Sequence, residues 1–419
     1  MNGTDARQLC LELLHADSEG DVIRLLSAAG FWNVPRVWRY YGDMENNFSA
    51  IGNQMSRPDA ALVEKLINSI DARLTNECLE QGLDPEGPDA PPTIQDAVAA
   101  FFCGTRGQGP GAGRISNWPD TKRRDVARGI TLAATGYGPR EGSGKPCFTV
   151  ADAGEGQTPE MMPDTLLSLI RSNKLRIPFV QGKFNMGSTG VLPFCGKNHV
   201  QLIITRRNPT LVADNRRHDS DGKWGFTVVR REDPVGSAKH STTTYLAPLG
   251  ADTNPRKGGV LRFDEGEMPL FPEGRNPYAR RAEWGTLVKL YEYAATGYSN
   301  TNILLPDGLL SRLDLLLPDV ALPIRLHECR KYAGHKGSFE TTLAGLSVRL
   351  EDNKGENLER GFPSSCPLSA QGEQMTATIF AFKKGRAQTY RRNEGIIFTL
   401  NGQTHGHLTV DFFRLSAPF

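Results

Sequence analysis

"VEKLINSIDARL", residues 63–74, repeats two kinds of side chain at helical spacing. A polar stripe of Glu64, Asn68 and Asp71 lies roughly 100° around the helix from an apolar stripe. The apolar positions follow i, i+4, i+7 and i+11, which predicts a face buried in a core. These apolar positions are Val63, Ile67, Ile70 and Leu74.

The polar stripe has two interpretations. A carboxylate such as that of Glu64 can polarise a water molecule. An amide oxygen such as that of Asn68 can complete the coordination of magnesium, which prefers oxygen ligands and bound phosphates. A solvated helix flank uses the same residue types. Pro58 and Asp59 suit the first turn of this helix, but the helix alone does not decide between the two.

Composition limits the class of protein. The 419 residues are enough for two or three domains, and the net charge of +2 gives no general argument for nucleic acid or membrane binding. Seven cysteines are scattered without a CxxC pair, which favours reduced thiols and a cytoplasmic setting. We expect neither a secretory signal nor a membrane span.

The stretch "VADAGEGQTPEMM" predicts a strand that runs into a glycine turn. Asp152, Gly154 and Gly156 form the pattern D-x-G-x-G. The glycines allow the backbone to approach a ligand closely, and a carboxylate at a strand end can accept a hydrogen bond from an exocyclic amine. Asp and Gly are also common in ordinary turns, so this motif is weak alone.

The stretch "QGKFNMGSTGVLPFCG", residues 181–196, predicts a glycine-rich loop before a helix start. Exposed backbone N–H groups at Gly182, Gly187 and Gly190 would make an anion site, to which Lys183 could add a positive charge. A plain glycine-rich connection would explain the same glycines.

Two shorter stretches carry less information. In "EWGTLVKLYEY", Gly285 and Thr286 begin a strand, where a hydroxyl could hold a base-linked water. "GYGPREGSGKP" looks like a phosphate-binding P-loop, but Pro139 replaces its first glycine and Pro146 its final Ser or Thr, so we exclude that motif.

The rest of the chain alternates helical and strand patterns. Helices are expected at "DARQLCLELLHA" and "DVIRLLSAAGF", and at "TIQDAVAAFF" and "DTKRRDVARGITLAA" within a Gly/Pro-rich insertion at about 81–146. "FWNVPRVWRYYGD" is expected to be an ordinary packed edge, with an arm that packs on a partner as the alternative. Strands are expected at "PCFTVADAGEG", "HVQLIITRR", "WGFTVVRRED" and "GTLVKLYEY". A second α+β unit is expected from the strand patterns "FETTLAGLSVRLED", "QMTATIFAFKKG" and "EGIIFTLNGQTHG".

Taken in order, the motifs resemble the GHKL ATPase superfamily, which includes the gyrase B subunit, heat-shock chaperones of the ninety class, MutL and MORC proteins. The resemblance lies in E-x-x-x-N-S-x-D-A at "EKLINSIDA", D-x-G-x-G at "DAGEG", a glycine lid at "GKFNMGSTG" and G-T at "WGTLVKL". It covers roughly residues 55–295 and is nearest to the MutL and MORC type.

The resemblance implies an α+β fold in three parts. A helical or arm segment spans residues 1–50. A Bergerat-type two-layer ATP-binding sandwich, with helices on an antiparallel or mixed sheet, spans 51–310. A ribosomal-S5-like α/β transducer domain, complete or shortened, spans 311–419, because "YRRNEGIIFTLNGQTHG" resembles the V-N-G-R strand of that domain.

The resemblance also implies residue roles. Glu64 matches the general base that activates water, Asn68 matches the ligand of Mg²⁺, and Asp152 matches the carboxylate that binds adenine. The residues matched to ATP binding are Asn68, Asp71, Ala72, Asp152, Gly154, Gly156, Gly182, Lys183, Phe184, Gly187, Ser188, Thr189, Gly190 and Thr286.

The sequence departs from the family in two respects. Asp71 and Asp152 are 81 positions apart, farther than in compact members, which marks the insertion as special to this chain. The family's phosphate-sensing basic residue has no clear counterpart, so either Lys383 or Lys384 substitutes for it or the residue is absent.

An ATPase with ATP and Mg²⁺ as cofactors is therefore expected, forming a homodimer on ATP binding. Its expected target is DNA or a partner protein, in a role such as repair, chromatin-like compaction or anti-phage defence. The alternatives are a chaperone-like or signalling clamp that acts on protein and a nucleotide-binding scaffold with little turnover.

Overall fold

This computed structural model describes most of the chain. The described residues are 3–52, 57–104, 111–138, 144–169, 174–182, 189–212, 218–234, 236, 239–295, 308–331, 339–386 and 394–416. Lys183, Phe184, Gly187 and Ser188 of the expected lid lie outside them.

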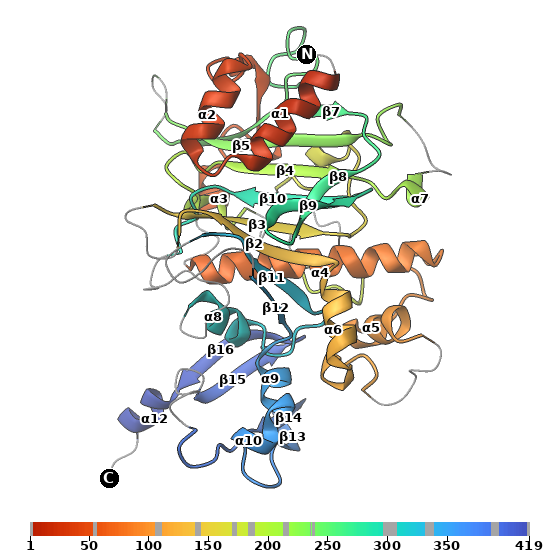
Figure 1. The fold of residues 1–419 in the computed structure, drawn as a ribbon, viewed down its shortest axis with the longest axis vertical. Helices are drawn as coiled ribbons and strands as arrows, with labels where there is room; N and C mark the ends of the chain where they lie inside the picture. Colours follow the sequence, from red (N-terminus) through yellow and green to blue (C-terminus); the bar gives the residue numbers. More distant parts are fainter. Residues whose placement is uncertain are drawn as a thin grey trace.

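A ten-stranded sheet runs through the described part of the molecule (Figure 1). Its order is β1-β6-β5-β4-β10-β3-β2-β11-β12, with β7 also paired to β5. The pairs are antiparallel except β11 with β2, which is parallel, so the expected α+β class is confirmed. The strands are β1 (Trp38–Tyr40), β2 (Ile130–Gly136), β3 (Pro146–Asp152), β4 (Gln201–Arg206), β5 (Trp224–Glu232), β6 (Thr242–Leu246), β7 (Leu261–Phe263), β10 (Gly285–Leu290), β11 (Ile324–Glu328) and β12 (Phe339–Leu343).

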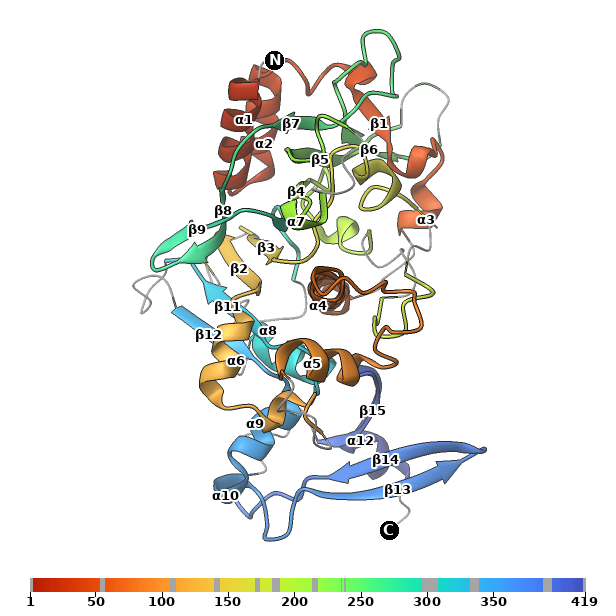
Figure 2. The ribbon, with the colours of Figure 1, turned by 90° about the vertical axis from the view of Figure 1, so that its right-hand side faces the viewer.

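Both faces of the sheet are buried. Along β3, Phe148 and Val150 belong to one core cluster, while Cys147 and Ala151 belong to another, because successive side chains of a strand point to opposite faces. Helix α4 (Pro58–Glu80) covers the first face, and α1 (Gly3–His15) and α2 (Glu19–Ala28) cover the second (Figure 2). The N-terminal segment thus adds a layer to the two-layer sandwich expected for 51–310.

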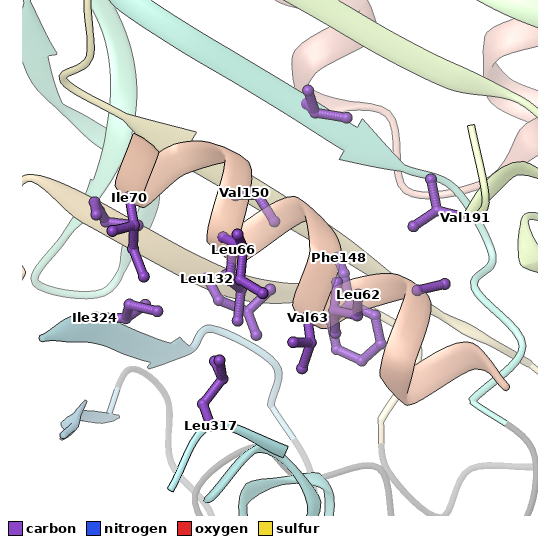
Figure 3. Close-up of a cluster of buried hydrophobic side chains, with 14 of the residues drawn as sticks. Leu62, Val63, Leu66, Ile70, Leu132, Phe148, Val150, Val191, Leu317 and Ile324 are labelled. Carbon is purple, nitrogen blue, oxygen red and sulfur yellow. The ribbon is translucent and has the colours of Figure 1, made fainter. Parts of the chain in front are cut away.

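Helix α4 is anchored as its apolar stripe predicted. Val63, Ile67, Ile70 and Leu74 are each at most 1% exposed. The helix is also buried on its other side, where α5 (Ile94–Phe102) and α8 (Leu309–Leu316) pack against it. Figure 3 shows apolar side chains of α4 beside residues of the sheet and Leu317; the labelled residues include Leu62, Val63, Leu66, Ile70, Leu132, Phe148, Val150, Leu317 and Ile324.

The helix expected over "DTKRRDVARGITLAA" is wrong in its second half. Helix α6 (Asp120–Ala127) ends before Gly129, and β2 then pairs with both β3 and β11 inside the sheet. The β-branched residues Ile130 and Thr131 favour this strand. The expected insertion at 81–146 therefore includes a central strand of the fold.

The sheet also continues past the expected domain boundary at 310, because β11 and β12 extend it. "FETTLAGLSVRLED" is a strand only at β12; after Gly345, with φ of 89°, the chain forms helix α9 (Leu346–Asp352). Two separate hairpins follow, and they confirm the strands expected at "QMTATIFAFKKG" and "EGIIFTLNGQTHG". The hairpins are β13 (Ser364–Ala370) with β14 (Glu373–Ile379), and β15 (Gly395–Leu400) with β16 (Gln403–Thr409).

Other features lie at the edge of the central sheet or outside it. The expected packed edge at "FWNVPRVWRYYGD" is confirmed, because its residues Trp38 to Tyr40 form the edge strand β1 against β6. None of the described helices is both long and apolar enough to span a bilayer. The other elements are α3 (Phe48–Gly52), α7 (Pro209–Val212), α10 (Lys354–Asn357), α12 (Val410–Ser416) and the hairpin of β8 (Met268–Glu273) with β9 (Asn276–Ala282).

Candidate functional site

A cavity of about 300 Å³ lies between α4 and the sheet. Its lining includes Asn68, Ser69 and Ala72 from α4, Asp152 from the end of β3 and Thr286 from β10. This volume is at the small end of the range for ligand pockets. Segments that are far apart in the sequence thus meet around one cavity.

Asp152 is the buried carboxylate of this cavity, with 5% of its surface exposed. The Ser69 hydroxyl donates to its Oδ2 at 2.8 Å, and the Gly154 backbone N–H donates to its Oδ1 at 3.1 Å. Burial raises the pKa of Asp152 to about 6, although these two hydrogen bonds act in the opposite direction. Each oxygen can accept a further hydrogen bond, so the group can bind a donor on a ligand.

Three polar side chains form a row across neighbouring strands. Thr286 on β10 lies opposite Asp152 on β3 and opposite Thr205 on β4. The Thr205 and Thr286 hydroxyl oxygens are 3.0 Å apart, and the Gln157 backbone N–H donates to the Thr205 hydroxyl at 3.0 Å. Thr205 is not among the predicted site residues, although strand alternation in "QLIITRR" places it on the same face as Ile203.

The turn after β3 packs too closely for side chains. A Cβ atom on Gly154 would lie 2.6 Å from the Ala72 Cβ. Gly156 has a φ of +62°, and a Cβ atom there would lie 1.8 Å from the Arg206 carbonyl oxygen. The two glycines and Ala72 therefore let the D-x-G-x-G turn rest on α4 and on the end of β4.

Asp71 fixes the start of the expected lid to α4. Its side chain is fully buried and accepts hydrogen bonds from the backbone N–H groups of Gln181 and Gly182, both at 2.9 Å. The Lys174 ammonium lies 3.5 Å from the same carboxylate. A charge-assisted bond of this kind is stronger than a neutral one. Asp71 therefore acts on the loop rather than directly on the cavity, whose lining does not include it among the described residues.

Asn68 lines the cavity and is half-buried. Within the described ranges, no group of three or more His, Cys, Asp or Glu side chains could hold a metal ion. One amide oxygen fits Mg²⁺ when phosphates and water supply the remaining ligands, which is how this ion is usually bound. Asn68 therefore fits the role of a single protein ligand.

Glu64 lies one helical turn before Asn68 and is half-buried. It is not one of the described residues that line the cavity. Its Oε1 accepts a 3.1 Å hydrogen bond from the Nε2 of Gln403, a residue of β16. This contact could not be predicted from local sequence patterns, because the two residues are 339 positions apart.

The cavity also holds polar groups that the sequence analysis did not single out. Lys65 is 7% exposed and lines the cavity, and burial lowers its pKa to about 8. The structure shows no hydrogen bond or ion pair from its ammonium to another described residue. The buried Oε1 of Gln157 likewise has no hydrogen-bond partner among them. Arg207 lines the cavity and pairs with Glu155 at 2.5 Å.

The other expected site residues lie elsewhere. Thr189 and Gly190 are buried before a short helical turn at Leu192–Phe194. Lys383 donates from its Nζ to the Gly355 carbonyl at 2.6 Å, and Lys384 is exposed. Both lysines belong to the part of the chain from α9 to α12, which we call the C-terminal unit. The C-terminal residue that hydrogen-bonds to Glu64 is therefore Gln403 and not either lysine.

No protein-family model matches this chain, and no curated protein matches it. The case for a function therefore depends on the geometry of the site.

Proposed function

We propose that this protein is an ATP-binding and ATP-hydrolysing molecular switch of the GHKL type, built on a Bergerat-type fold with an S5-like C-terminal unit. One observation carries the proposal. Segments 68–72, 152–156 and Thr286 meet around one cavity, and segment 181–182 is held beside it by Asp71. Ordinary turns and helix flanks would not have to converge in this way.

The sheet end of the cavity suits an adenine base. Asp152 can accept a hydrogen bond from the exocyclic amine, and the hydroxyls of Thr286 and Thr205 can hold a water against the ring. Val150 and Val288 line the same cavity and provide apolar contact for the ring faces.

The other end suits phosphates. Lys174 lines the cavity and supplies positive charge, and Asn68 would hold Mg²⁺ through its amide oxygen. The ion, when bound, would neutralise phosphate charge.

Glu64 supplies the acid–base chemistry in this proposal. Its carboxylate takes a proton from water while the water oxygen bonds to the γ-phosphorus. The bond from that phosphorus to the bridging oxygen then breaks, releasing ADP and phosphate. Glu64 lies one helical turn before Asn68, so the general base and the Mg²⁺ ligand would lie on neighbouring turns of α4.

The Glu64→Gln variant tests the proposal. It should bind ATP as the wild type does and release phosphate roughly 10²- to 10⁴-fold more slowly, because it lacks the proton acceptor. Fluorescent-nucleotide binding and a phosphate-release assay measure the two properties. Glu356→Gln, an exposed change on α10, is the matched control and should behave as wild type. Wild-type turnover in Glu64→Gln would contradict the role of Glu64 as general base.

The ATP-dependent homodimer and the DNA target stay predictions based on the family resemblance. The chaperone-like, signalling and low-turnover alternatives stay open in the same way. A gel shift at several salt concentrations, with and without a non-hydrolysable ATP analogue, separates DNA from protein targets, because DNA binding weakens steeply with salt.

A further inference from the structure

The hairpin of β15 and β16 brings one side chain to α4. Leu400 pairs with Gln403 across the turn, and Asn401 and Gly402 have φ values of +50° and +81°. Two central residues with positive φ define the tight turn that Asn-Gly favours in hairpins. This turn fixes Gln403 as the first residue of β16, and its Nε2 donates to the Glu64 Oε1 at 3.1 Å.

The same turn also touches the start of the expected lid. The Gln181 side-chain amide donates to the Asn401 carbonyl oxygen, while the Gln181 backbone N–H donates to Asp71. One turn of the C-terminal unit therefore contacts both Glu64 and the segment that Asp71 holds beside the cavity.

The turn is anchored from behind. The Asp319 backbone N–H donates to the Gly402 carbonyl at 3.3 Å, and the Thr404 hydroxyl donates to the Leu315 carbonyl at 2.6 Å. Because α8, which contains Leu315, packs against α4, the hairpin and the helix that carries Glu64 share one support.

We infer that Gln403 is a positioning residue for Glu64, so that hydrolysis requires the C-terminal hairpin to be docked. A glutamate side chain rotates about three bonds, so a hydrogen bond is needed to hold its carboxylate in one orientation. Among the described residues, the Gln403 amide makes that hydrogen bond. Holding Oε1 leaves Oε2 to accept the proton of water. A neutral amide orients the carboxylate without the positive charge that would make it a weaker base. The inference rests on the proposed function.

The experiment compares turnover and binding in the full chain. Gln403→Ala should lower kcat roughly 10- to 100-fold, the order of loss that a small misplacement of a catalytic group causes. Its affinity for a non-hydrolysable ATP analogue should stay within about twofold of wild type, because Gln403 is outside the cavity lining. Gln374→Ala, the same change on the exposed strand β14, should leave both values unchanged.

A pH profile separates positioning from a merely structural role. Gln403→Glu places a second carboxylate beside Glu64, and two like charges raise the pKa of the pair. The acidic limb of the pH–kcat profile should therefore move to higher pH. A structural change would lower the profile without moving that limb.

The outcomes separate a failure of the inference about Gln403 from a failure of the proposed ATPase function. If Glu64→Gln is inactive and Gln403→Ala turns over at the wild-type rate, the inference is overturned and the proposed function stands. If Gln403→Ala loses analogue binding together with turnover, the hairpin has a structural role and the inference also fails. If the wild-type protein does not hydrolyse ATP, both fail.

Discussion

Asp152 is buried, yet both of its oxygens keep the capacity for another hydrogen bond. Burying a carboxylate with only two partners costs free energy, which is why its pKa rises to about 6. A ligand amine that donates to it would offset part of that cost. The proposed function assigns Asp152 this recognition role.

This explanation predicts a pH dependence of binding. With a pKa of about 6, the ionised fraction of Asp152 falls from about nine-tenths at pH 7 to about one-tenth at pH 5, so affinity should fall about ninefold. Adenosine is the appropriate probe, because phosphates themselves titrate near pH 6. Isothermal titration at the two pH values measures the change. Asp152→Asn should bind weakly at both, and an unchanged affinity of the wild type between pH 7 and 5 would contradict the role of Asp152.

Lys65 leads to a prediction about folding stability, because its charge is buried without a partner among the described residues. The fold lowers its pKa to about 8 from 10.5, so the unfolded chain binds more protons between these pH values. Stability should therefore rise with pH across that window, and the cost of the charge is fully present below pH 8. That cost is roughly 3 kcal/mol. Lys65→Met keeps the length of the side chain, and we expect it to raise the free energy of unfolding at pH 7 by about 1–3 kcal/mol.

Urea denaturation at pH 7 and pH 10 measures this effect. The advantage of Lys65→Met over wild type should shrink at pH 10, where the wild-type lysine is mostly neutral. Lys354→Met, an exposed change on α10, should be neutral at both pH values. A loss of stability in Lys65→Met at pH 7 would mean that the ammonium has a stabilising partner.

At the scale of elements, the sequence predicted those segments whose pattern is local. The stripe in α4 follows directly from 3.6-residue periodicity, and β3, β4, β5 and β10 follow from strand patterns. The D-x-G-x-G turn was also predictable, because its glycines meet a local requirement for close approach. These elements contain most of the residues that line the cavity.

The elements that were missed depend on tertiary contacts. The segment of β2 follows α6 after only two residues, so the local pattern predicts a continued helix, whereas burial between β3 and β11 makes it a strand. The alternation in "FETTLAGLSVRLED" predicts one continuous strand, whereas the chain turns at Gly345 and forms helix α9. Gln403 could not be linked to Glu64 from sequence, because their contact depends on how a distant hairpin docks.

At the scale of the whole molecule, the sheet and the C-terminal unit are joined at several points. Arg123 of α6 makes a bidentate ion pair with Asp352 of α9, with distances of 2.8 and 3.1 Å. The turn at Gly402 packs on Asp319, just before β11. The C-terminal unit is thus coupled both to the insertion and to the sheet.

The Gly402→Ala substitution tests the contact between the Gly402 turn and Asp319. A Cβ atom at this position would lie 1.8 Å from the Asp319 carbonyl oxygen, so the turn must move away from Asp319. Alanine at φ of +81° also costs about 1–2 kcal/mol. We expect the hydrogen bond from the Asp319 N–H to the Gly402 carbonyl to break, so that the Asp319 amide exchanges at least about tenfold faster.

Gly372→Ala is a matched control for this prediction. Gly372 occupies the turn of the β13–β14 hairpin with a φ of +86°, and no atom lies within 4 Å of a Cβ built there. Both variants carry the cost of positive φ, but only Gly402→Ala has the clash. Hydrogen exchange of peptides that span Asp319 should therefore accelerate in Gly402→Ala alone. Equal exchange in the two variants would contradict docking of the hairpin, since the conformational cost of alanine would then account for the whole effect.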